Sequence, residues 1–161
     1  MIREMTTADW PQVAAIYRQA IRRGTSTFAT ELPDTEEWIC EHREECRLVV
    51  EENGQVIGWA MLTPTSSKPA YRGSVEVSVY LDEARLGKGY GTALLNTLID
   101  ACEKEGFWSL YSVIIAENAH SIALHEKCGF RIIGRREKVA KDRFGVWQDT
   151  VLMERRSKDI Y

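Results

Sequence analysis

The sequence lacks the features that mark membrane, secreted and metal-binding proteins. No apolar run approaches the ~20 residues that a helix needs to cross a bilayer, and residues 1–5 lack the basic-then-apolar pattern of a signal peptide. The four cysteines are scattered, without a Cys-x-x-Cys pair, and neither His42 nor His120 has a partner at ligand spacing. We therefore expect a cytoplasmic chain with free thiols, no membrane partner and no metal.

The chain also lacks an excess of charge and any internal boundary. Lys and Arg number 21 against 24 Asp and Glu, a net charge of −3 at pH 7, so a phosphate backbone would be weakly repelled and no nucleic-acid partner is expected. There are only four prolines, and no repeat, linker or low-complexity tract interrupts the sequence. With 161 residues, 44% of them hydrophobic, we expect residues 1–161 to form a single domain.

Hydrophobic periodicity predicts a mixture of helices and strands. Asn53-Gly54 between two apolar runs is typical of a β-hairpin, because both residues tolerate the positive φ angles of a type I′ turn. Residues 74–81 alternate apolar with polar side chains, as a strand does. The other expected elements are helices over 9–22, after Asp34, across Leu94 to Cys102 and over 118–127, and strands over 110–115, 130–133 and 146–153. These elements predict an α/β (α+β) fold whose helices cover a largely antiparallel sheet.

A glycine loop precedes the expected helix around Leu94. Gly87, Gly89 and Gly91 leave backbone N–H groups unshielded at a helix start, where the helix dipole adds positive potential, and this favours a phosphate or pyrophosphate site. Lys88 is followed by glycine, without the Ser or Thr of a Walker loop, and the spacing does not fit a Rossmann fingerprint. A turn that merely starts the helix is the alternative.

Several segments together resemble the GCN5-related N-acetyltransferase (GNAT) family over nearly the whole chain. They are residues 77–81, the loop 85–91, the helix after it, residues 118–121 and Gly129-Phe130. The two glycines of the family's Gln/Arg-x-x-Gly-x-Gly/Ala signature fall on Gly89 and Gly91, while Leu86 stands at the Gln/Arg position. The resemblance implies a sheet of about seven strands flanked by about four helices, with acetyl-CoA as cosubstrate. It assigns acetyl-CoA binding to Val79, Tyr80, Leu81, Gly87, Lys88, Gly89, Tyr90, Gly91, Thr92, Asn118 and Ser121.

Four further segments look like the phosphinothricin and methionine sulfoximine acetyltransferase branch of that family: residues 16–17, 24–28, 70–76 and 145–149. This resemblance implies direct transfer of acetyl to the α-amine of a small amino-acid-like molecule, and a homodimer. A protein, peptide or polyamine N-acetyltransferase and a non-catalytic acyl-CoA-binding module are the alternatives.

Two residues are candidates for proton transfer. Glu76 lies mid-strand on the face opposite the valines, where the branch carries its catalytic glutamate, so it is the expected general base; the alternative is a solvated surface carboxylate. His125 shares a helix face with Asn118 and Ser121 and stands where most of the superfamily has a proton-donating tyrosine. An imidazolium there could protonate the departing thiolate, or the ring could simply pack against Phe130.

Four residues are expected to bind the substrate. Arg72, four residues before Glu76, would share its strand face if the strand extends back that far, and its guanidinium could then hold the substrate carboxylate. Tyr71 belongs to the same segment, and Phe28 and Trp147 are expected to wall the pocket. The alternatives are a solvated arginine at the strand end and aromatic side chains of the core.

Overall fold

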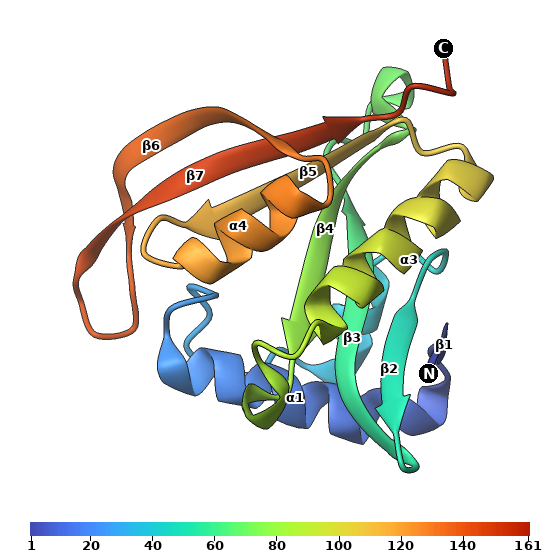
Figure 1. The fold of residues 1–161 in the computed structure, drawn as a ribbon. Coiled ribbons are helices and arrows are strands. Elements are labelled where there is room, and N and C mark those ends of the chain that lie inside the picture. The colour runs from blue at the N-terminus through green and yellow to red at the C-terminus, as the bar shows by residue number, and fades with distance from the viewer.

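The computed structural model describes all residues, 1–161, and is built around one seven-stranded sheet of order β1-β2-β3-β4-β5-β7-β6 (Figure 1). Neighbouring strands are antiparallel except for β4 and β5, which are parallel. The predicted α/β class with a mixed, largely antiparallel sheet is therefore confirmed. The strands are β1 (Ile2–Glu4), β2 (Leu48–Glu52), β3 (Gln55–Pro64), β4 (Ser74–Leu81), β5 (Ser109–Ile115), β6 (Arg131–Lys141) and β7 (Trp147–Arg156).

Two helices lie on each face of the sheet (Figure 1). They are α1 (Trp10–Arg23) and α2 (Thr35–Glu41) on one face, and α3 (Tyr90–Glu105) and α4 (Ala119–Lys127) on the other. Local chemistry sets several of their ends. Gly24 ends α1 with a φ of 73°, and the Asp34 carboxylate caps α2 by accepting hydrogen bonds from two backbone N–H groups of its first turn.

Each face of the sheet buries its own apolar core. The larger core joins Leu94, Leu95 and Leu98 of α3 to strand residues that include Val75 and Val77. The smaller core joins α1 and α2 to the opposite face of β2 and β3 and is rich in tryptophan: Trp10, Trp38 and Trp59 all belong to it. Because successive strand residues point to opposite faces, the valines of β4 face α3 while Glu76 and Tyr80 face the α1 side.

The hairpin and the fourth strand form as the sequence predicts, but the last hairpin differs. Asn53 and Gly54 adopt φ angles of 51° and 78°, and β4 spans the expected residues. β6 continues to Lys141 instead of ending at residue 133. β6 is an exposed edge strand with many charged side chains, and its pairing with β7 is interrupted by irregularities. Its sequence therefore lacks the alternation of apolar and polar side chains that could reveal its length.

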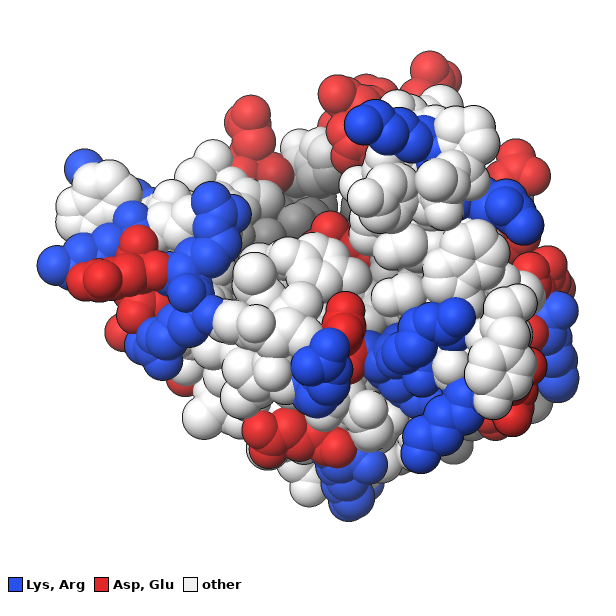
Figure 2. Space-filling model, turned by 90° about the horizontal axis from the view of Figure 1, so that it is seen from above, with Lys and Arg blue, Asp and Glu red and all other residues white.

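Charged side chains of both signs are interspersed on the face seen from above (Figure 2). That face presents no continuous basic surface of the kind that binds a nucleic-acid backbone. The helices are also too short or too polar to cross a bilayer. No group of His, Cys, Asp or Glu side chains is arranged to hold a metal ion.

Candidate active site

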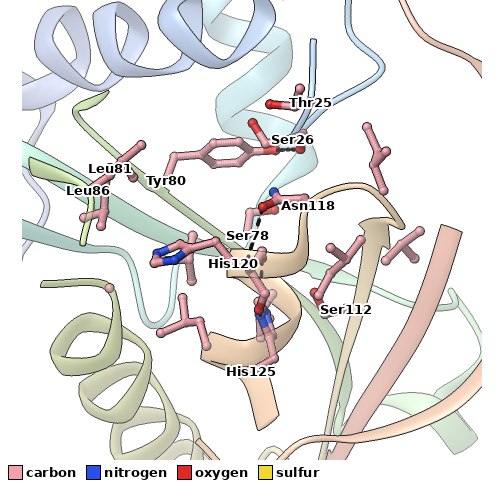
Figure 3. A pocket seen from close by; sticks show the side chains of 18 of the residues that line it. Thr25, Ser26, Ser78, Tyr80, Leu81, Leu86, Ser112, Asn118, His120 and His125 are labelled. Atoms are coloured by element: carbon pink, nitrogen blue, oxygen red, sulfur yellow. Dashed lines mark hydrogen bonds between the residues drawn. The ribbon is translucent and has the colours of Figure 1, made fainter. Parts of the chain in front are cut away.

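β4 and β5 separate halfway along and open a cleft. The two strands pair at only three positions, the last of which joins Glu76 to Tyr111. Beyond this pair the strands diverge (Figure 1), and residues 76–81 and 112–115 line opposite walls of a cleft of about 540 Å³. Ser78 from one strand and Ser112 from the other lie in these walls (Figure 3). The divergence frees backbone groups that an unbroken sheet would pair.

The register of β4 shows which amides are freed. Asp82 donates its N–H to Ile57 of β3 at 2.8 Å, and antiparallel pairing turns alternate residues toward the partner strand. Val79 and Leu81 therefore direct their N–H groups away from β3, into the cleft, whereas the Tyr80 N–H belongs to the β3 side. Of the three backbone positions that the sequence suggests, two face the cleft; Tyr80 contributes its side chain instead.

The glycine loop forms the end of the cleft next to α3. Gly87 and Gly89 have φ angles of 75° and 87°, and a Cβ built on either would have no atom within 4 Å, so the backbone there is open to a ligand. Gly89 is the N-cap of α3, and without a side chain it leaves the first N–H groups of the helix uncapped. Uncapped N–H groups at a helix start suit the diphosphate of acetyl-CoA.

Three side chains of the loop do not line the cleft. Tyr90 donates its hydroxyl hydrogen to Glu52 at 2.5 Å, and Arg85 donates to the same carboxylate at 2.7 Å, so both side chains turn toward the β2–β3 hairpin. Lys88 is exposed and does not line the cleft. A Cβ on Gly91 would lie 3.3 Å from Leu81 and Leu124 atoms. Close packing therefore explains the glycine at position 91.

Glu76 lies where the cleft begins. Its carboxyl group is half-buried, and burial raises its pKa above the usual value, with no ion pair to offset the effect. A carboxylate whose pKa is raised is a stronger base than a solvated one. The position at the last pair of β4 and β5 places this base at the mouth of the cleft.

His125 also lines the cleft, but in a neutral state. The ring is buried and packs edge-on against Phe130, with the ring centres 5.0 Å apart. Nδ1 lies 2.7 Å from the Ser121 carbonyl oxygen, which only accepts, so Nδ1 carries the hydrogen and Nε2 is left as an acceptor. Burial lowers the pKa of His125 below its ordinary value. Of the two roles left open for His125, the packing against Phe130 is observed, and burial disfavours the charged imidazolium that would donate a proton.

The start of α4 supplies further polar groups. The Asn118 side-chain oxygen accepts the Ser121 N–H at 3.2 Å and caps α4, which leaves its amide NH₂ group free. Asn118, Ser121 and His120 all line the cleft. Asn118 therefore combines a cap with an available donor.

The four expected substrate residues do not converge on the cleft. β4 begins at Ser74, so Arg72 precedes the strand and stacks its guanidinium over Trp108, with the central carbon 5.2 Å from the ring centre. Trp108 fits there because residue 73 is glycine; a Cβ at Gly73 would lie 2.1 Å from the ring. Trp147 is 55% exposed on β7, and Phe28 is half-buried outside the cleft.

Tyr71 lies in a second pocket, on the other side of the Glu76–Tyr111 pair. This pocket, of about 440 Å³, we call the Lys68 pocket, because Lys68 is the one lysine or arginine among its lining residues. Its lining residues come from the paired ends of β4 and β5, from β7 and from the segment between β3 and β4. The lining residues are Thr65, Ser66, Lys68, Tyr71, Ser74, Ser109, Tyr111 and Glu154.

The structure adds cleft residues that the sequence did not single out. Arg23, Thr25 and Ser26, at and just after the end of α1, form part of the cleft wall. Tyr80 donates its hydroxyl hydrogen to the Ser26 carbonyl at 3.1 Å and holds this segment against β4 (Figure 3). Thr25 and Ser26 belong to the segment 24–28 that resembles the phosphinothricin branch, but no role was assigned to them, and Arg23 belongs to no motif; the packing of α1 on the sheet brings all three to the cleft.

Comparison with known proteins agrees with this geometry. Residues 10–130 match the acetyltransferase (GNAT) family. A phosphinothricin N-acetyltransferase from Alcaligenes faecalis is 36% identical over 165 residues, which cover 96% of this chain and 81% of that protein. An L-methionine sulfoximine/L-methionine sulfone acetyltransferase from Pseudomonas paraeruginosa is 32% identical over 159 residues, covering 95% of this chain and 92% of that protein.

A solved structure shows the same fold with the cosubstrate. The crystal structure of a GNAT superfamily phosphinothricin acetyltransferase from Sinorhizobium meliloti, in complex with acetyl-CoA, superposes with a TM-score of 0.87 at 30% identity, covering 100% of this chain and 95% of that chain. The divergent strands and the open glycine loop provide the cleft and the uncapped N–H groups that acetyl-CoA requires. The chain belongs to the GNAT family and is an acetyl-CoA-dependent N-acetyltransferase.

Proposed function

We propose that the protein acetylates the α-amine of a small free amino acid whose side chain ends in a polar group of the phosphinothricin, methionine sulfoximine or methionine sulfone type. One observation carries this proposal: Glu76, which lines the cleft, is paired with Tyr111, which lines the polar Lys68 pocket. An amine that enters from the Lys68 pocket would meet the base at the mouth of the cleft. The names of the two similar enzymes support the same substrate class.

Acetyl-CoA supplies the activated acetyl group when bound. The loop from Gly87 to Gly89 and the uncapped N–H groups of α3 would hold its diphosphate, while Asn118 and Ser121 offer polar groups to its pantetheine arm. Val79 and Leu81 offer N–H donors where negative charge develops on the acyl oxygen.

Glu76 acts on the amine. Its carboxylate accepts a proton from the ammonium group, and its raised pKa reduces the mismatch between the two groups. No cysteine lines the cleft, and we propose that the acetyl group passes directly to the amine without a covalent enzyme intermediate. The C–N bond forms, the C–S bond of the thioester breaks, and the proton that the nitrogen loses after the attack goes to the departing CoA thiolate. His125, neutral and hydrogen-bonded to Ser121, keeps the α4 wall in place instead of donating a proton.

The substrate carboxylate needs a cation near Glu76, and the structure favours a residue other than Arg72 for this role. Arg72 stacks on Trp108, so we assign the carboxylate to the Lys68 ammonium group, in the pocket that also contains Tyr71. A carboxylate held by Lys68 would leave the α-amine on the side of the pocket that borders Glu76.

We further propose a single-domain homodimer that works in the cytoplasm. The β6–β7 hairpin exposes large apolar side chains that an interface would cover, and we propose that Trp147 serves this interface. We call the set the hairpin surface. Its members are Ile132, Ile133, Phe144, Val146 and Trp147. All four cysteines are free, which suits a reducing compartment.

The test is a panel assay of CoA release with purified protein. The panel contains phosphinothricin, methionine sulfoximine, methionine sulfone, unmodified amino acids, a polyamine and a peptide with a free N-terminus. We expect the highest kcat/KM for the first three compounds. A higher kcat/KM for the peptide or the polyamine would overturn the proposed substrate class while leaving the acetyltransferase assignment intact.

A further inference from the structure

The cations around the glycine loop are nearly all engaged elsewhere. Arg85 binds Glu52, and Lys88 is exposed outside the cleft. Arg22 is exposed and donates to Glu83 at 2.8 Å. Arg23 is the one lysine or arginine that lines the cleft, which Leu86 and Gly87 of the loop also line.

Arg23 has an unsatisfied donor. Its Nη1 atom is buried and has no hydrogen-bond partner. Nη1 forms a long ion pair with Oε2 of Glu83 at 3.6 Å, beyond hydrogen-bond distance, and the other oxygen of that carboxylate already accepts from Arg22. A buried donor without an acceptor is costly, and a charged one more so. An anionic ligand in the cleft would supply the missing acceptor.

The loop itself lacks a cation for an anionic ligand. Leu86 stands where the family signature has Gln or Arg, and the side chain of Arg85 is held by Glu52. The helix start offers the equivalent of only about half a positive charge to a diphosphate that carries two negative charges. A guanidinium group, with several donors in one plane, is suited to complete such a site.

We propose that Arg23, from the end of α1, binds the diphosphate of acetyl-CoA and supplies the cation that is missing at position 86. Arg22, the preceding residue, carries the same charge but does not line the cleft, so it serves as the matched control. The inference rests on the acetyl-CoA-dependent activity of the family and adds a residue from outside the signature loop.

The experiment measures binding instead of turnover. Isothermal titration calorimetry with CoA and with 3′-dephospho-CoA is performed on the wild type, Arg23→Gln, Arg23→Lys and the matched neighbour variant Arg22→Gln. Thermal unfolding of each variant verifies the fold. We expect Arg23→Gln to raise Kd about 10- to 100-fold for both ligands and to lessen the salt dependence of Kd. Arg23→Lys should recover part of the affinity, and Arg22→Gln should bind as the wild type does.

Three results would overturn the role of Arg23. The first is an unchanged Kd in folded Arg23→Gln. The second is a loss of affinity for CoA but not for 3′-dephospho-CoA, which would place Arg23 at the 3′-phosphate. The third is an equal loss of affinity in Arg22→Gln, which would reflect the general electrostatic field of α1. Failure of the wild type to bind CoA would contradict the cosubstrate assignment itself, so the two failures are distinguishable.

Discussion

Glu76 and Tyr111 form the last pair of the parallel ladder between β4 and β5, and the cleft opens directly beyond them. The same pair borders the Lys68 pocket on its other side, since Tyr111 lines that pocket. The expected base therefore lies at the junction of two cavities. The predictions below test what each side of this junction does.

Replacing Glu76 with glutamine should abolish proton acceptance while keeping the shape of the side chain. We expect kcat to fall roughly 10²- to 10⁴-fold, the usual contribution of general base catalysis, with the Kd for acetyl-CoA unchanged. Stopped-assay kinetics and calorimetry give the two quantities. Wild-type turnover in Glu76→Gln at pH 7 would show that another group accepts the proton.

The pH dependence should follow Glu76 and not His125. Because the pKa of Glu76 is raised, kcat/KM should increase as the pH rises through that value, and this inflection should disappear in Glu76→Gln. The pKa of His125 is lowered, so its ring is already neutral at pH 7. His125→Phe should therefore lower kcat less than tenfold and should not change the pH profile of kcat/KM between pH 7 and 9. A loss of activity in the wild type on deprotonation of His125 would restore it as the proton donor.

The raised pKa of Glu76 also has a consequence for stability. When a carboxyl has a higher pKa in the folded chain than in the unfolded chain, the free energy of unfolding of the protein decreases as the pH rises through the interval between the two values. Glu76→Gln should therefore unfold at a higher temperature than the wild type at pH 7, and the difference should vanish below the ordinary carboxyl pKa. Equal melting temperatures at both pH values would show that the carboxyl is as well solvated as in the unfolded chain.

A charged side chain on the glycine loop should block the diphosphate. Gly89→Asp places a carboxylate in the open space beside the start of α3, and we expect acetyl-CoA binding to be lost. Gly54→Asp is the matched control, because Gly54 has a similar φ of 78° and equal space but lies in the β2–β3 turn. Each change should cost about 1–2 kcal/mol of stability, because a side chain is strained at positive φ. Binding by Gly89→Asp as tight as by the control would refute the diphosphate site.

Lys68 and Arg72 should differ in their effect on the substrate. Lys68→Ala removes the proposed carboxylate partner, and because the pocket is open to solvent we expect kcat/KM for the amino acid to fall about tenfold, equivalent to ~1.4 kcal/mol. The decarboxylated amine should be a poor substrate for the wild type and lose little more in the variant. Arg72→Ala should change kcat/KM less, because Arg72 stacks on Trp108. The reverse order would return the carboxylate to Arg72.

Much of the fold follows from local signals in the sequence. The positive φ angles at Asn53-Gly54, the carboxylate cap at Asp34 and the alternation over residues 74–81 depend on neighbouring residues, so these elements form where the sequence predicts. The glycine loop and the start of α3 also depend only on neighbouring residues, because an uncapped helix start needs only the glycines before it. β6 is the exception, since an exposed edge strand carries no buried periodicity.

The sequence by itself determined the glycine loop and the face of β4 that carries Glu76, because both are short-range properties, and its resemblance to the GNAT family indicated the cosubstrate. Only the tertiary structure decided where β4 and β5 part, that His125 is buried and neutral, that Arg72 turns to Trp108, and that Arg23 reaches the cleft. Each of these depends on which distant segment packs against the residue. Desolvation and available partners are set by that packing, and no spacing along the chain encodes them.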